Sequence, residues 1–213
     1  MLVGSQNLKG TIRCVIYDCD GVLFDSFEAN TRLYNDFCFH LGREPLRPEE
    51  MEYVHAHTVY EAIHFLFGRE KNLEKRALEF MKQLDLRKYI VYLKMEPDLL
   101  ETLRRLKAAG VIRSICTNRT TSMKYIMERF NLWPYFDMVV TALDVKHPKP
   151  HPESIERIAS SFQLQRKEIL FVGDSEVDQQ SARAAQVLFV AYKNRNLPGD
   201  FYIENHLELL RFL

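Results

Sequence analysis

The stretch VIYDCDGVLFDS, from Val15 to Ser26, ends an apolar run with two aspartates, Asp18 and Asp20, and then a glycine. Two carboxylates this close repel each other unless a positive charge lies between them or one of them carries a proton. One interpretation is a turn with solvated acids, because Asp and Gly are common in turns. The alternative is a metal and nucleophile site at the end of a buried strand. The other motifs of the sequence distinguish between these two interpretations.

Five continuous apolar runs predict the buried strands of a parallel sheet, at residues 12–17, 111–116, 137–140, 169–172 and 187–192. Helical patterns lie between the later runs. One follows Pro97, with leucines on one face and Gly110 as its C-cap, and two more cover 121–130 and 153–162. Strands that alternate with helices predict a doubly wound α/β fold.

One interval breaks this alternation. Residues 27–94 contain no convincing strand and are rich in helix formers and aromatic residues. We predict an inserted helical cap domain at 27–94 and a core domain made of 1–26 and 95–213. The aromatic stripe of the cap is expected to form its core, and its members are Tyr34, Phe37, Phe39 and Leu41.

Composition excludes several classes of protein. The 213 residues are 46% apolar and 27% charged, as in ordinary soluble proteins. The 29 basic and 29 acidic residues cancel, so no nucleic-acid partner is expected. No apolar run is long enough for a membrane helix. The first ten residues lack the pattern of a secretory signal and are expected to form a short leader.

The four cysteines form no CxxC pair and lie mostly in apolar runs; they are Cys14, Cys19, Cys38 and Cys116. We expect buried free thiols in a reducing cytoplasm. Cys19, between the two aspartates, is expected to be a packed thiol rather than a redox group.

Polar side chains directly follow three of the predicted strands, and they are Asp18, Asp20, Thr117, Asn118, Asp174 and Asp178. Ligands of open α/β sheets bind beyond the carboxyl ends of the strands, so these residues are expected to converge on one site. After the third predicted strand, Lys149 stands between Pro148 and Pro150, which restrict the backbone and direct the lysine.

These residue types suggest phosphoryl chemistry. Clustered carboxylates favour a hard cation such as Mg²⁺, while Lys149 and Thr117 complement phosphoryl oxygens. A carboxylate can attack phosphorus and form an aspartyl-phosphate. A second carboxylate two residues later can donate a proton to the leaving oxygen and then accept one from water.

The chain resembles the haloacid dehalogenase superfamily in its phosphatase branch, with four motifs in order. They are DCDGVLFDS at Asp18, CTNR at Thr117, the KP step at Lys149 and GDSEVDQQSA from Gly173. The resemblance spans roughly residues 12–192. Within the branch it is most similar to the phosphoglycolate phosphatase and β-phosphoglucomutase group, whose helical cap lies between the first two motifs.

The resemblance implies catalytic roles for four residues. Asp18 would be the nucleophile and Asp20 the acid and base. Thr117 would hydrogen-bond the phosphoryl oxygens, and Lys149 would neutralise charge on the nucleophile and the phosphate.

The resemblance also implies a magnesium site and further phosphate contacts. Asp18, the backbone carbonyl of Asp20 and Asp174 would hold Mg²⁺, with Asp178 behind them. The backbone of Asn118 would bind phosphate. Arg119 would contact an anionic part of the substrate or, alternatively, be a solvated surface residue.

Two stretches depart from the family pattern. Ser181 and Gln186 stand where glycines are common, which affects packing and not chemistry. The cap stretch VHAHTVYEA stands where relatives often carry a glycine-containing specificity loop, so the resemblance does not identify the substrate. His55 and His57 within it either reach the site or are solvated in an exposed turn.

The favoured hypothesis is a cytoplasmic Mg²⁺-dependent phosphatase, a monomer or homodimer, that hydrolyses a small phosphorylated metabolite. A phosphomutase of the β-phosphoglucomutase type would use the same residues with a sugar hydroxyl as acceptor. A protein of another class, which keeps the fold but acts by binding, is the third hypothesis. The cap is expected to open and close on hinges near 26–27 and 95–97.

Overall fold

Strand β1 (Cys14–Tyr17) lies in the middle of a parallel sheet of six strands, in the order β5-β4-β1-β6-β7-β8. The other five strands are β4 (Ile112–Cys116), β5 (Met138–Val140), β6 (Ile169–Gly173), β7 (Leu188–Tyr192) and β8 (Phe201–Ile203). This is a computed structural model, and it describes residues 10–212. The predicted doubly wound α/β fold is confirmed, with the order of strands reversing at β1. The expected leader, residues 1–9, lies outside the described residues.

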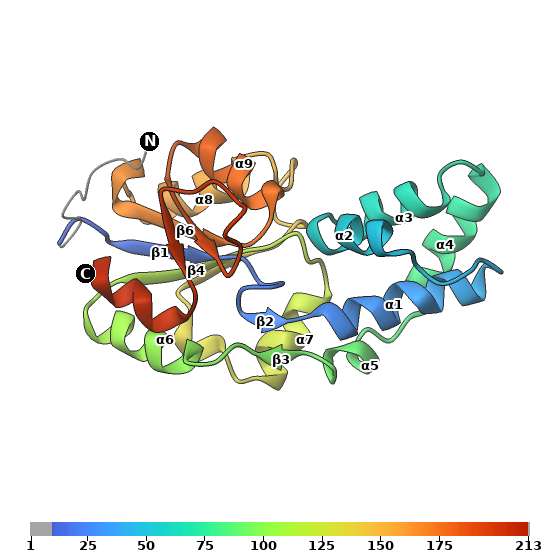
Figure 1. The fold of residues 1–213 in the computed structure, drawn as a ribbon, viewed down its shortest axis with the longest axis horizontal. Coiled ribbons are helices and arrows are strands. Elements are labelled where there is room, and N and C mark those ends of the chain that lie inside the picture. The colour runs from blue at the N-terminus through green and yellow to red at the C-terminus, as the bar shows by residue number, and fades with distance from the viewer. Residues whose placement is uncertain (1–9, 213) are drawn as a thin grey trace.

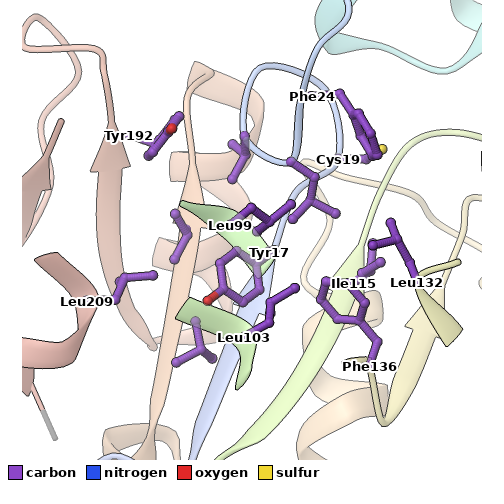
Figure 2. Close-up of a cluster of buried hydrophobic side chains, with 14 of the residues drawn as sticks. Tyr17, Cys19, Phe24, Leu99, Leu103, Ile115, Leu132, Phe136, Tyr192 and Leu209 are labelled. Carbon is purple, nitrogen blue, oxygen red and sulfur yellow. The ribbon is translucent and has the colours of Figure 1, made fainter. Parts of the chain in front are cut away.

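Helices cover both faces of the sheet (Figure 1). Successive side chains of a strand point to opposite faces, so Val15 and Tyr17 enter one core while Cys14 and Ile16 enter the other. The first core packs against α6 (Leu99–Ala108), α7 (Ser122–Arg129) and the 3₁₀ helix η3 (His206–Phe212), and Figure 2 shows Tyr17 at its centre. The second core packs against α8 (Glu153–Ser161) and α9 (Glu176–Ala185). Short 3₁₀ turns η1 (Trp133–Tyr135) and η2 (Arg166–Glu168) precede β5 and β6.

The long interval after β1 folds into helices that extend from one end of the sheet (Figure 1). They are α1 (Phe27–His40), α2 (Pro48–Ala56), α3 (Val59–Phe67), α4 (Lys71–Gln83) and α5 (Arg87–Ile90). Helices α1–α4 enclose a separate apolar core that contains Tyr34, Phe37 and Leu41, whereas Ile90 of α5 belongs to the first core of the sheet. We use the name cap for α1–α5; the predicted boundaries at 27 and 94 stay a prediction.

One residue of the predicted aromatic stripe lies outside that core. Phe39 is 88% exposed, so its assignment to the core of the cap was wrong. The physical reason is the helical repeat: two residues after the buried Phe37, a side chain lies on nearly the opposite face of α1.

A small antiparallel ribbon joins the two connections between core and cap. Strand β2 (Phe24–Asp25) pairs with β3 (Lys94–Met95). This ribbon was not predicted, because two-residue strands are too short to show a hydrophobic period. It brings together segments that leave and re-enter the core.

Several local predictions are confirmed. Gly110 follows α6 with a φ of 73°, as a C-cap glycine does. Gln186 adopts the same left-handed conformation after α9, and Ser181 donates a hydrogen bond of 3.2 Å to the carbonyl of His151. All four cysteines are free and buried. In the described part of the chain, no helix has the length and apolar character that crossing a membrane requires.

Candidate active site

The predicted site residues gather at the carboxyl edge of the sheet. Asp18, Thr117 and Asp174 each follow the last residue of β1, β4 or β6. Because β4 and β6 are the two neighbours of β1, these three strand ends lie side by side. The amide of Asp18 donates to the carbonyl of Val172 at 2.9 Å, and this continues the ladder up to the site. The predicted convergence is therefore observed, which excludes a solvated turn at Asp18.

Lys149 is the central cation of the site. Its Nζ donates to Oδ1 of Asp18 and to Oδ1 of Asp178, both at 2.6 Å, and the residue is 2% exposed. Burial opposes the charge of this lysine, but the two carboxylates raise its pKa, so it is ionised. The side-chain amide of Asn118 donates to the carbonyl of Lys149 at 3.0 Å and fixes the segment that carries it.

Asp178 positions Lys149 and the loop after β6. Its second oxygen, Oδ2, accepts from the hydroxyl of Ser175 at 2.6 Å and from its amide at 3.2 Å. The hydroxyl of Ser175 in turn accepts from the amide of Asp178, which forms a capping box at the start of α9. Both carboxylate oxygens of Asp178 are thus engaged.

The carboxylates of the site carry more negative charge than its cations balance. Oxygens of Asp18, Asp174 and Asp178 lie within 4.8 Å of one another. Burial raises the pKa of Asp18 to about 7, and burial with repulsion from neighbouring aspartates holds the pKa of Asp174 well above its ordinary value. Together with Asp20 these are four carboxylates, while the described residues place two cations, Lys149 and Arg119, in contact with them. With all four carboxylates ionised, two negative charges would be left over. The raised pKa values of Asp18 and Asp174 reflect this repulsion as well as burial, and one divalent cation with oxygen ligands would balance the excess charge.

Gly21 leaves the space that the carboxylate of Asp174 fills. A Cβ at position 21 would lie 1.9 Å from Oδ2 of Asp174, and the glycine has a φ of +69°. No side chain fits between this turn and the carboxylate, so the backbone after Asp20 can approach Asp174 closely.

We expect Gly21→Ala to weaken Mg²⁺ binding about 10- to 100-fold, because the added carbon displaces Asp174. Isothermal titration calorimetry with Mg²⁺ measures this. Gly110→Ala is the matched control, since Gly110 has a similar φ of +73° but open space around it. Both variants carry similar backbone strain, so equal loss of affinity in both would contradict the role of Gly21.

Asp20 is held by Arg119 rather than by Lys149. Nε of Arg119 donates to Oδ2 of Asp20 at 2.7 Å, and its NH2 group donates to Oδ1 at 2.6 Å. Burial opposes ionisation of Asp20, but this bidentate pair lowers the pKa of Asp20 below its ordinary value. The guanidinium is 13% exposed, so the alternative of a solvated surface arginine is wrong.

Cap residues reach the site, which could be predicted only in part. Nδ2 of Asn30 in α1 donates to Oδ1 of Asp20 at 3.2 Å and to Nδ1 of His55 at 3.0 Å. Nothing in the sequence singles out Asn30. Burial lowers the pKa of His55, so its ring is neutral and its proton is on Nε2. His55 belongs to α2 and not to an exposed turn, whereas Nδ1 of His57 donates to the carbonyl of Tyr53 at 2.9 Å.

Two spaces meet at Asp18 and Asp20, and their linings differ. The first, which we call the apolar cavity, has a volume of about 380 Å³ and lies between cap and core. Its apolar lining includes Leu33, Tyr34, Val54, Val59, Leu84 and Tyr89. The second, the acidic groove, measures about 930 Å³ and is lined by Asp25, Glu49, Glu52, Glu96, Asp174 and Glu176. Thr117, Asn118 and Lys149 line the apolar cavity.

A parallel sheet, helices inserted after its central strand, and carboxylates at its carboxyl edge are typical of an α/β enzyme that acts at that edge. The chain belongs to the haloacid dehalogenase-like hydrolase family, whose model matches residues 15–192. The predicted membership is therefore confirmed.

Three relatives describe the similarity more closely. A solved haloacid dehalogenase-superfamily hydrolase, subfamily IA, variant 1, from Geobacter sulfurreducens is 40% identical, with 95% of this chain and 100% of that chain covered and a TM-score of 0.83. A Caldanaerobacter subterraneus protein, provisionally named as the pyrophosphatase PpaX, is 28% identical over 95% of this chain and 94% of its own length. A phosphoglycolate phosphatase from Salmonella choleraesuis is 37% identical over 90 residues, which are 42% of this chain and 36% of the relative.

Proposed function

We propose that the protein is a Mg²⁺-dependent phosphatase that hydrolyses a small phosphorylated metabolite through an aspartyl-phosphate on Asp18. The observation that carries the proposal is the buried ammonium of Lys149, 2.6 Å from Oδ1 of Asp18, at the carboxyl end of the central strand. A binding protein has no need of a carboxylate held beside a buried lysine in this way. The relatives named as phosphatases support the same reaction class.

Asp18, Asp174 and the backbone carbonyl of Asp20 would hold the cation. Bound there, Mg²⁺ supplies positive charge that favours the ionised form of Asp18 and draws charge from the phosphoryl oxygens. Asp178, whose oxygens are occupied by Lys149 and Ser175, acts behind these ligands as a positioning residue.

An oxygen of Asp18 attacks phosphorus, and the bond from phosphorus to the alcohol oxygen breaks. The hydroxyl of Thr117 and the amide of Asn118 donate to the phosphoryl oxygens, while Lys149 balances their charge. A proton from Asp20 goes to the leaving oxygen, and Asp20 then takes a proton from the water that hydrolyses the aspartyl-phosphate.

Arg119 bears directly on the proton transfer. While it pairs with Asp20, that carboxylate is ionised and can accept a proton but not donate one. Phosphoryl oxygens compete well for a guanidinium. We therefore assign to Arg119 a move toward the substrate's phosphoryl group. The buried Asp20, left without its cation, then takes up a proton from solvent and can act as the acid.

Hydrolysis assays on p-nitrophenyl phosphate, phosphoglycolate and hexose phosphates test the proposal by the release of inorganic phosphate. We expect turnover with Mg²⁺ and at least a ~10²-fold loss after chelation, because the metal contributes several kcal/mol to the transition state. Adding Mg²⁺ back restores the rate. Wild-type protein that binds Mg²⁺ but turns over no member of the panel would overturn the proposal in favour of a binding role.

The same assay separates the phosphatase from the phosphomutase. A phosphatase releases inorganic phosphate in proportion to the ester consumed. A phosphomutase converts a hexose 1-phosphate to its 6-phosphate isomer with little release of phosphate. Cytoplasmic location and a monomeric or homodimeric state remain part of this proposal.

A further inference from the structure

The apolar cavity lies on the side of the site where the phosphoryl group is expected. Thr117, Asn118 and Lys149 line it, but none of them lines the acidic groove. A phosphoryl group that these residues hold and that Asp18 attacks therefore has the cavity beside it. The acidic groove contains Asp174 and several glutamates, which repel an anionic substrate.

The lining of the cavity beyond the phosphate end is mainly hydrocarbon. Side chains of α1, α2, α3 and α5 contribute Leu33, Val54, Val59 and Ile90. Two buried polar atoms belong to residues near the phosphate end. They are Nε2 of His55 and Oδ1 of Asn118, and neither has a hydrogen-bond partner among the described residues. Both residues line the cavity, as do Asp18 and Asp20, and apolar side chains line the part further away.

The charges of the cavity do not suit a second anionic group on the substrate. Its cationic lining residues in the described chain are Lys82, Arg119 and Lys149. Lys149 is paired with Asp18 and Asp178, and Arg119 is paired with Asp20 and, under the proposed mechanism, then with the phosphoryl group, so neither is left for a second anionic group. Lys82 is exposed at the rim. A carboxylate deep in the cavity would therefore lose its hydration without gaining a free cation, which is costly.

The volume of the cavity also exceeds what a two-carbon alcohol needs. Pockets that bury drug-sized ligands measure roughly 300–1,000 Å³, and this cavity measures about 380 Å³. A two-carbon group would leave most of the apolar wall in contact with water, and that wall would contribute nothing to binding.

We propose that the natural substrate is a phosphate monoester of a bulky, mainly apolar alcohol, whose hydrocarbon part fills the apolar cavity. This inference rests on the proposed function and specifies its substrate class. The cap then selects the substrate by burying hydrocarbon rather than by pairing with charge.

A series of n-alkyl phosphates from ethyl to octyl phosphate tests this, because lengthening the chain changes the buried area while the leaving oxygen stays chemically similar. We expect kcat/KM to rise about fourfold for each methylene until the cavity is full. Phosphoglycolate is expected to have a kcat/KM at least ~10-fold below that of hexyl phosphate. Binding of the unreactive alkylphosphonates, measured by calorimetry, should show the same rise without turnover.

Leu33→Gln places a polar group in the lining, so it is expected to reduce the gain per methylene to about twofold or less. Leu143→Gln is the matched control, because Leu143 is 55% exposed and outside the cavity; it should keep the wild-type gain. If Leu33→Gln does not fold, the phosphonate series on the wild-type protein decides alone.

The outcomes separate the two proposals. No Mg²⁺-dependent hydrolysis of any ester overturns the proposed function. Hydrolysis that is independent of chain length, or that favours phosphoglycolate or hexose phosphates over hexyl phosphate, overturns the apolar substrate and leaves the phosphatase standing.

Discussion

Asp18→Asn is expected to lower kcat for phosphate ester hydrolysis on the order of 10⁴- to 10⁶-fold, as loss of a nucleophile does in other covalent mechanisms. Asparagine has nearly the shape of aspartate, and its carbonyl can still accept from Nζ of Lys149, which now lies 2.6 Å from Oδ1 of Asp18. The substitution therefore removes the attacking charge and changes little of the packing around a residue that is 7% exposed.

Steady-state assays of the two proteins, with circular dichroism to establish that both are folded, measure this effect. Asp144→Asn serves as the control, because Asp144 is an exposed aspartate on the loop after β5 and caps only its own turn. We expect Asp144→Asn to retain the wild-type rate. A rate for Asp18→Asn within tenfold of wild type would show that another group attacks phosphorus.

Lys149→Met is expected to lower both activity and stability. Removing the ammonium leaves the carboxylates of Asp18 and Asp178 buried without their cation. Leaving a buried charge unpaired typically costs ~3–5 kcal/mol, so the free energy of unfolding without Mg²⁺ should fall by that amount. Loss of preorganised charge at the phosphoryl group should lower kcat about 10²- to 10³-fold.

Two further variants separate the structural from the catalytic part of this effect. Lys146→Met, at an exposed lysine of the same segment, is the control and should change neither quantity. Adding Asp178→Asn to Lys149→Met removes one unpaired charge and keeps an oxygen for Ser175, so it should recover part of the stability. Activity should stay low in this double variant. Recovery of activity together with stability would mean that Lys149 acts only by holding the fold.

The core of the fold could be predicted from the sequence because its strands are buried on both faces. The runs at 14–17 and 169–172 are continuously apolar. Between helices of clear period, such a run predicts a buried strand with few alternatives. The edge strand β8 was missed because it spans three residues, Phe201–Ile203, two of which are half-buried. Phe39 was wrongly predicted to lie in the core of the cap because it is hydrophobic, although its position on the helix turns it away from that core.

Those residues of the site that directly follow the end of a strand could be predicted from the sequence. Asp18, Thr117 and Asp174 are brought together by the sheet itself, and the position of a strand end can be inferred from local pattern. The contacts of Asp20 with the cap, in contrast, depend on how the cap packs. Asn30 meets Asp20, and His55 meets Asn30, only because of where α1 and α2 lie. The pairing of Arg119 with Asp20 lies outside the cap, but it joins residues 99 positions apart.

The hydrogen bond from Asn30 to Asp20 joins a helix of the cap to the residue proposed to move protons. Asn30 can hold Asp20 in place only while α1 lies against the site. A phosphate ester that is too large for the cap to close over would then not be hydrolysed, even if its phosphoryl group fits the site.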